Sequence, residues 1–223
     1  MPLPPGPGPS QPSTTPNAAQ PVAKPVQGCA NGLPTALSKD CPAAPATITL
    51  PKNVNDAAQK AYTDSFPGGK SLEHGGTLVQ DASGNVQVRG VGPGTSGTFQ
   101  PDRTVAGAGE KIVGTFHTHP YDASEGGYTG VSFSGADINY ANHFKEPIYV
   151  DAGTRQFAVM PTQATPALAP GVLSQEWDQK FSALLGAGKS MQDASAQASN
   201  AVAQKYGMAY YEGSNGVLTK VSC

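Results

Sequence analysis

The sequence predicts an α/β fold of the α+β kind, with a mostly antiparallel mixed sheet flanked by helices and a disordered proline-rich segment before it. Three observations predict this fold. Prolines crowd the first 50 residues. Short apolar or alternating segments come in pairs joined by turn residues, as in β-hairpins. Longer segments carry apolar residues at helical spacing, and a mixed order of hairpins and helices favours an antiparallel sheet covered by helices.

Residues 1–50 are expected to form a tether, and residues 51–223 a single domain. In the first segment, proline alternates with Gly, Ser and Gln. Such a composition cannot bury enough apolar surface to offset the entropy lost on ordering, and it favours extended polyproline conformations. The remaining residues, about 170, are enough for a compact core.

Composition and charge argue against several classes of function. A formal charge of −2 and an isoelectric point near 6.0 offer no basic surface to a nucleic acid. No run of about 18 apolar residues occurs, so no membrane span or membrane partner is expected. The N-terminus does not have the pattern of a signal peptide. Three cysteines leave the redox compartment open, because Cys29 and Cys41 either pair or stay reduced and Cys223 is left over.

The first half of the domain is predicted to contain one helix and four strands. Ala58, Ala61 and Tyr62 recur at helical spacing before the helix-breaking residues 67–69. Residues 81–85 suit a hairpin connection. The predicted elements are a helix at 54–66 and strands at 77–80, 86–89, 98–100 and 111–119.

The second half begins with a long polar, glycine-containing loop at 121–133. Ser134 then opens a helix that carries Ile138, Ala141 and Phe144 on one face. The later elements are strands at 148–150 and 156–160, helices at 172–185 and 188–206, and a hairpin of 208–211 with 217–221. One apolar set fits a buried helix face better than a binding stripe: Trp177, Phe181, Leu184 and Leu185.

The most informative stretch is Gly114-Thr115-Phe116-His117-Thr118-His119-Pro120. Successive side chains of a strand point to opposite faces, so His117 and His119 share one face. Ile112 and Phe116 lie on the other face, where a core can cover them. Two imidazoles about 6–7 Å apart along a strand can converge on one metal ion. Zinc held by two histidines, a carboxylate and a water is a known catalytic arrangement.

Asp137 is the best candidate for the carboxylate ligand, because it lies where the next helix begins. The pattern Ser134-x-x-Asp137 also resembles a capping box, in which the two side chains satisfy backbone amides at the start of a helix. Asp122, in the preceding loop, is a rival ligand. From the residues alone these alternatives stay open.

His117-x-His119-Pro120 followed by Ser134-x-x-Asp137 resembles the signature of the JAMM (JAB/MPN-type) zinc metallopeptidases, and the chain is similar to the bacterial JAB-like domains of that family. The family also has a glutamate on an upstream strand, for which this sequence offers Glu73-His74-Gly75-Gly76-Thr77-Leu78. The resemblance is strongest over residues 54–160. It implies a JAB/MPN-like fold, whose layers are similar to those of the cytidine deaminases.

The resemblance further implies that His117, His119 and Asp137 bind Zn²⁺. Glu73 would take a proton from the activated water and pass it to the leaving amine, and Ser134 would hold the oxygen of the tetrahedral intermediate. The physical reasons agree. Zinc lowers the pKa of its water from about 16 to near 7, and a positioned carboxylate contributes about 10²–10⁴-fold. A hydroxyl donor at the developing oxyanion adds roughly 3 kcal/mol.

One feature departs from the family pattern. Fourteen residues separate His119 from Ser134, about twice the gap that is usual in the family. The extra length, which includes residues 125–130, is sufficient for a flap over the cleft and puts the substrate class in question more than metal binding. Other titratable residues are assigned lesser roles: Glu110 as a rival base, and His74 and His143 as surface or supporting residues.

The sequence therefore favours a zinc-dependent metallopeptidase that hydrolyses peptide or isopeptide bonds in a protein or peptide substrate. The tether and the resemblance to small bacterial domains suggest an effector or toxin-type protease. Such a protein would be carried by a secretion apparatus, delivered into a target cell and matched by a cognate immunity protein; otherwise a cytoplasmic location is expected. Two other functions stay open, namely hydrolysis of peptidoglycan stem peptides and a non-catalytic MPN-type interaction module. A purely structural zinc site would need a fourth protein ligand.

Overall fold

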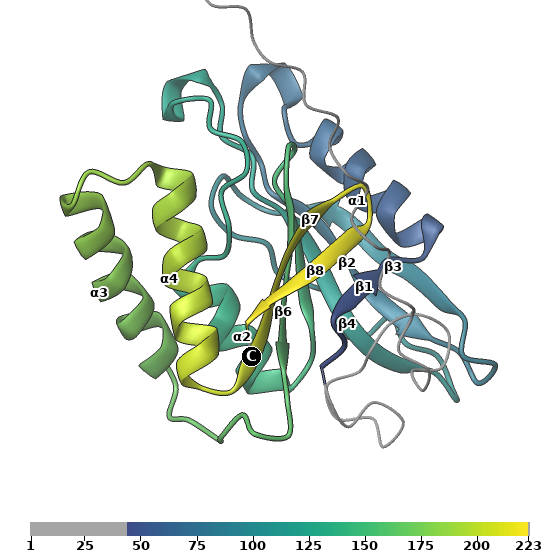
Figure 1. Cartoon of the computed structure of the whole chain (residues 1–223). Coiled ribbons are helices and arrows are strands. Elements are labelled where there is room, and N and C mark those ends of the chain that lie inside the picture. The colour runs from purple at the N-terminus through teal and green to yellow at the C-terminus, as the bar shows by residue number, and fades with distance from the viewer. Residues whose placement is uncertain (1–43, 223) are drawn as a thin grey trace, which may run out of the picture.

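An eight-stranded sheet runs through the computed structural model, which describes residues 44–222 (Figure 1). The strand order is β1-β8-β7-β6-β5-β4-β2-β3, and every neighbouring pair is antiparallel except β4 and β5. The strands are β1 (Thr47–Thr49), β2 (His74–Gln80), β3 (Val86–Pro93), β4 (Lys111–Thr118), β5 (Ile148–Asp151), β6 (Gln156–Pro161), β7 (Met208–Ser214) and β8 (Val217–Ser222). The prediction of a mixed α/β fold with a mostly antiparallel sheet is confirmed.

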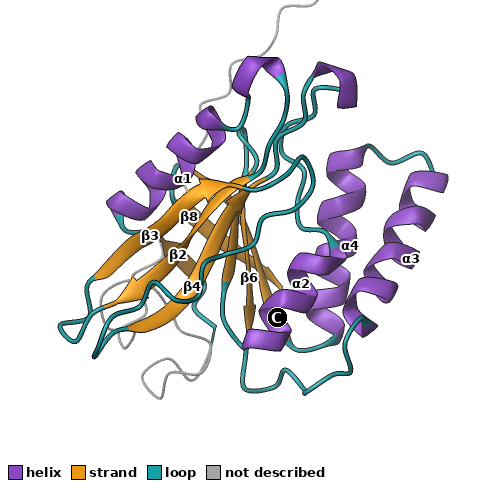
Figure 2. Ribbon diagram, turned by 180° about the vertical axis from the view of Figure 1, so that it is seen from behind, coloured by secondary structure: helices purple, strands orange, loops and turns teal. Residues whose placement is uncertain are grey.

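Helices lie on both sides of the sheet and enclose two cores. Helix α1 (Lys52–Asp64) lies on one side, and α2 (Gly135–Phe144), α3 (Val172–Gly186) and α4 (Met191–Lys205) lie on the other (Figures 1 and 2). Successive residues of a strand point to opposite faces, so they enter different cores. In β5, Tyr149 packs on the α1 side, and Ile148 and Val150 pack on the α2–α4 side. None of the helices within residues 44–222 is long and apolar enough to cross a membrane.

Most of the predicted elements are present, with ends that differ by a few residues. The helix expected at 54–66 is α1, and the helix expected at 188–206 is α4, which begins at Met191 with Ser190 as its N-cap. The strand that carries the two histidines is β4, and the hairpin near the C-terminus is formed by β7 and β8. Short 3₁₀ turns, Pro67–Gly69 and Ala123–Glu125, interrupt the loops.

Two expectations about the sheet are wrong. Residues 98–100 form no strand; the Thr95 amide donates to the Thr98 carbonyl oxygen at 2.8 Å, so the chain turns here before it can extend along the sheet. Conversely, residues 47–49, which are expected in the tether, form β1 and pair with β8, so the folded part begins before residue 51. The remaining tether residues, 1–43, and all three cysteines (Cys29, Cys41 and Cys223) lie outside the described residues.

The connection from β4 to β5 determines where the next helix begins. Because these two strands are parallel, the chain must return to the same end of the sheet, and it does so through the 121–133 loop and α2. The loop begins beside β5, where the His119 amide donates to the Asp151 carbonyl oxygen at 3.1 Å. The crossover brings the N-terminus of α2 to the carboxyl end of β4.

Candidate metal centre

His117 and His119 point into the same side of the sheet, as the alternation along β4 predicts. Thr118, between them, points to the opposite side, where its hydroxyl contacts the Ser65 hydroxyl at 2.8 Å and accepts from the His74 amide at 2.9 Å. Both imidazoles are buried. The strand therefore presents two fixed nitrogen ligands on one face.

Asp137 comes to these histidines from the first turn of α2. Ser134 is the N-cap, and its amide and hydroxyl both donate to Asp137 Oδ2 at 2.7 Å. In return, the Asp137 amide donates to Ser134 Oγ at 3.3 Å. Ser134-x-x-Asp137 is thus a capping box, and the same hydrogen bonds fix the orientation of the carboxylate toward β4.

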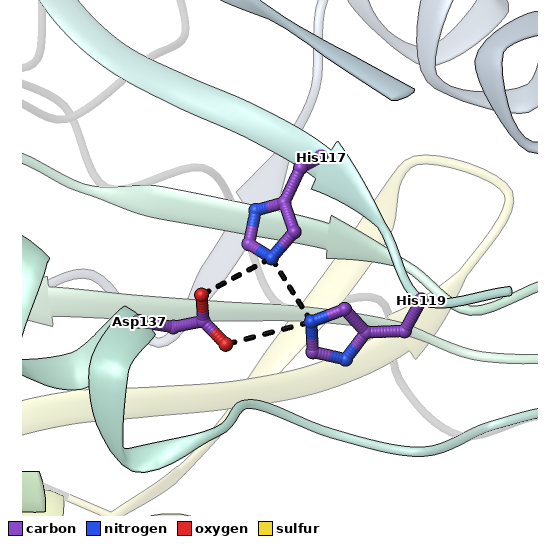
Figure 3. A group of neighbouring side chains, drawn as sticks. All are labelled: His117, His119 and Asp137. Carbon is purple, nitrogen blue, oxygen red and sulfur yellow. Dashed lines mark hydrogen bonds and ion pairs between the residues drawn. The ribbon is translucent and has the colours of Figure 1, made fainter. Parts of the chain in front are cut away.

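Three ligand atoms converge in this arrangement (Figure 3). His117 Nε2 lies 2.9 Å from His119 Nε2 and 3.2 Å from Asp137 Oδ1, and His119 Nε2 lies 3.4 Å from Asp137 Oδ2. His119 Nδ1 donates to the Ser132 carbonyl oxygen at 2.9 Å, so Nε2 is the nitrogen that can offer a lone pair to a metal when the ring is neutral. Two imidazole nitrogens and a carboxylate are ligands that zinc prefers, and these residues are close enough to bind a metal ion.

The combined effect of burial and neighbouring charges is to lower the pKa of Asp137 and to raise the pKa of His119. Although burial alone would raise the pKa of Asp137, the imidazoles of His117 and His119 hold that pKa well below its usual range. Burial lowers the pKa of His119, but the carboxylates of Asp137 and Glu73 outweigh it and the net shift is upward. Asp137 is therefore an anion, and without a metal the nearby carboxylates favour a proton on His119, which a bound metal ion would displace.

Glu73 lies at the end of the neighbouring strand. It precedes β2 by one residue, and Gly75 in that strand is paired with His117. Its backbone is held on both sides by the following loop, because the Glu73 amide donates to Thr95 O at 2.7 Å and the Gly94 amide donates to Glu73 O at 2.6 Å. Burial raises the pKa of the Glu73 carboxyl, and His117 and His119 only partly oppose this shift.

Glu73 and the three candidate ligands line a cleft of about 380 Å³. Tyr121 and Ser134 add hydroxyl groups to the same lining. Burial, with the nearby charges of Glu73 and Asp137, raises the pKa of Tyr121 to about 12, so its hydroxyl stays protonated at neutral pH. The lining also contains large apolar side chains: Phe99, Tyr140, Ile148, Trp177, Phe181 and Met191.

The rival residues are engaged elsewhere. The Asp122 carboxylate accepts from the Ser124 hydroxyl and from the Ser71 amide, and these bonds lower its pKa to about 2. Glu110 forms a two-point ion pair with Arg89, at 2.6 and 2.7 Å. Neither acid lines the cleft. The other two histidines, His74 and His143, are outside the ligand group.

The sequence reasoning missed the residues that brace the site from α4. The Ser132 amide donates to Ser195 Oγ at 2.9 Å, and the Ser132 carbonyl orients His119. Ser199 Oγ donates to the Phe133 carbonyl oxygen at 3.2 Å. Ser132 acts through its backbone carbonyl, so its side chain gives no sign of this role in the sequence. Ser195 lies 63 positions after Ser132, so no local pattern links the two residues.

The chain was compared with protein-family models, curated proteins and solved structures, and none of them matches it.

Proposed function

We propose that this protein is a zinc-dependent metallopeptidase of the JAMM type, which hydrolyses peptide or isopeptide bonds. The observation that supports the proposal most strongly is the convergence of His117, His119 and Asp137 on one point in the lining of a cleft, with a buried glutamate in the same lining. Three protein ligands leave a coordination position open, which is typical of catalytic rather than structural zinc sites.

In this proposal His117, His119 and Asp137 hold the ion. Bound zinc would supply Lewis acidity, which polarises the substrate carbonyl and makes water acidic near pH 7. Glu73 accepts a proton from the attacking water and delivers it to the amide nitrogen. The water oxygen becomes bonded to the carbonyl carbon, the C–N bond breaks, and the products are a carboxylic acid and an amine. The raised pKa of Glu73 suits a group that must both accept and release a proton.

Two hydroxyl groups are candidates for stabilising the developing oxyanion. Ser134 is the residue that the family resemblance suggests, but its hydroxyl hydrogen is directed at Asp137 Oδ2. We therefore propose that Ser134 mainly positions Asp137. Tyr121, which lines the same cleft, is the second donor.

We also propose a protein or peptide as the substrate, in the setting of a bacterial effector or toxin that a secretion apparatus delivers and an immunity protein restrains. The peptidoglycan alternative is less favoured because the sequence shows no recognisable wall-binding segment. A non-catalytic interaction module is less favoured because Glu73, His117, His119, Ser134 and Asp137 all adjoin the cleft.

The test compares the full-length wild type with Glu73→Gln and with Glu110→Gln, a matched control whose acid pairs with Arg89 away from the cleft. Each protein is loaded with zinc, its metal content is measured, and it is incubated with a cell proteome. We expect new protein N-termini with wild type and Glu110→Gln, and a loss of about 10²–10⁴-fold with Glu73→Gln at unchanged zinc content. Undiminished cleavage by Glu73→Gln would show that the assigned base is wrong. New muropeptides from purified cell wall, with an unaltered proteome, would favour the peptidoglycan alternative.

A further inference from the structure

Helices α3 and α4 lie after residues 54–160, where the family resemblance is strongest, and they contribute apolar side chains to the cleft. The rings of Trp177 and Phe181 in α3 stack at 4.5 Å with an interplanar angle of 20°. Trp177 Nε1 donates to Ser199 Oγ at 3.0 Å, which fixes the indole against α4. Phe181 is half-buried, and Met191, the first residue of α4, continues the same wall. These three side chains form what we call the apolar wall.

The apolar wall begins directly beside the metal ligands. Gly135, between Ser134 and Asp137, is packed against α3 so closely that an added Cβ would lie 3.1 Å from Trp177 Cβ and 2.7 Å from Ser174 Cα. Ser174 Oγ donates to the Gly135 carbonyl oxygen at 3.0 Å. The first turn of α2 therefore carries the carboxylate ligand on one side and contacts the apolar wall on another.

The described residues that line the cleft include two acids, Glu73 and Asp137, two histidines, His117 and His119, and no lysine or arginine. Arg103 donates to the Tyr140 hydroxyl at 3.1 Å, but it is paired with Glu146 through two contacts of 2.8 and 2.9 Å. Apart from the bound zinc of the proposed function, a free substrate carboxylate would therefore meet two acids and no lysine or arginine.

We infer that this protein is an endopeptidase that cleaves an internal peptide bond next to a bulky apolar side chain, which packs against Trp177, Phe181 and Met191. The inference rests on the proposed function and narrows it. Because Trp177 packs against Gly135, two residues before Asp137, a side chain bound on the apolar wall would lie close to the candidate metal ligands. The lack of a lysine or arginine in the lining leaves no side chain to hold the free C-terminus that a carboxypeptidase must recognise, and cleavage of peptides blocked at both ends distinguishes an endopeptidase from an aminopeptidase.

The experiment uses zinc-loaded full-length protein and a set of peptides that are blocked at both ends. One position beside the scissile bond, on either side in turn, is Phe, Leu, Ala, Glu or Lys. For wild type we expect kcat/KM to be at least about tenfold higher with Phe or Leu than with Ala. Phe181→Ala should lose most of this preference at unchanged zinc content, whereas Leu185→Ala, exposed on the same helix outside the cleft, should retain it.

Phe181→Arg provides a readout that simple destabilisation cannot mimic, because it should reverse the preference toward Glu at the same position. Cleavage that depends on Glu73 but is equally fast with all side chains would overturn the inference and leave the proposed function standing. The same holds for a preference for peptides with a free C-terminal carboxylate, or for isopeptide-linked lysine only. No cleavage of any peptide or protein by the zinc-loaded wild type would overturn both.

Discussion

His119 Nδ1 donates a hydrogen bond to the carbonyl oxygen of Ser132 at 2.9 Å. This bond selects the tautomer and ring orientation that direct Nε2 toward Asp137. Since the Ser132 amide is itself held by Ser195 Oγ at 2.9 Å, a helix that supplies no ligand helps to set the geometry of the candidate metal centre.

Ser195→Ala should therefore weaken zinc binding. The substitution leaves the buried Ser132 amide without its acceptor, which costs about 1–3 kcal/mol of stability, and it loosens the carbonyl that orients His119. Loss of such outer support typically weakens metal affinity by about 10–100-fold. Ser190→Ala is the control, because Ser190 caps the same helix, its hydroxyl accepts from the Asp193 amide, and it does not line the cleft. Zinc affinity by chelator competition and thermal unfolding distinguish the two; equal losses of affinity would contradict this role of Ser195.

Ser134→Ala tests the two roles of the capping box. Removing an N-cap costs about 1 kcal/mol, and here it also removes a hydroxyl donor from Asp137 Oδ2. Ser190→Ala removes the N-cap of α4, whose side chain accepts from the Asp193 amide, and it lies outside the cleft lining. Both variants should unfold at similarly lowered denaturant concentration, but only Ser134→Ala should bind zinc about 10–100-fold more weakly. Equal zinc affinity in the two would limit Ser134 to capping.

Gly75→Ala should destabilise the strand pair that carries the site. An added Cβ at Gly75 would lie 2.3 Å from the Phe116 carbonyl oxygen and 2.6 Å from the Phe99 ring, so the backbone of β4 would have to move. We expect a loss of at least about 1–3 kcal/mol together with weaker metal binding. Gly92 is paired with Gly75 across the sheet, and a Cβ added at Gly92 would meet no heavy atom within 4 Å, so Gly92→Ala should change stability by less than about 0.5 kcal/mol. Urea denaturation of both variants is the measurement.

Glu73→Gln should make the metal-free protein more stable at neutral pH. Burial raises the pKa of Glu73 in the folded state, so the ionised carboxylate destabilises that state. The effect should be absent below the unfolded pKa of about 4.3 and should grow as the pH rises through the folded pKa.

Glu110→Gln should behave in the opposite way. The Gly107 amide and Arg89 lower the pKa of Glu110, so its ionised form contributes stability above the unfolded pKa, and this contribution is lost as the pH falls through the folded pKa. Thermal unfolding of chelator-treated protein from pH 3 to pH 8 checks both signs. A Glu73→Gln variant less stable than wild type at pH 7 would contradict the assigned cause of the shift.

Local patterns predicted the three side chains that lie close enough to bind a metal ion, whereas the contacts that support them come from long-range packing. The alternation along β4 placed His117 and His119 on one face, and the spacing of Ser134 and Asp137 marked a helix start, because both signals lie within a few residues. The spacing of Trp177, Phe181, Leu184 and Leu185 predicts a buried face, but Phe181 and Leu184 are only partly buried and Leu185 is exposed. Trp177 is indeed buried, but its ring and that of Phe181 also line the cleft, which depends on how α3 docks on Gly135. The wrong strand at 98–100 and the unexpected β1 have the same origin, since strand formation depends on a partner elsewhere in the chain.

The parallel pairing of β4 with β5 also determines when His117, His119 and Asp137 come together during folding. An unfolded chain holds the two imidazoles near each other, but the aspartate joins them only after a crossover has closed, which is a slow, non-local event. A metal ion that binds only when all three ligands are in place would stabilise the connection from β4 to α2. Its binding free energy would then add to the free energy of unfolding. Sequestering the ion should then loosen the middle of the sheet before its edges.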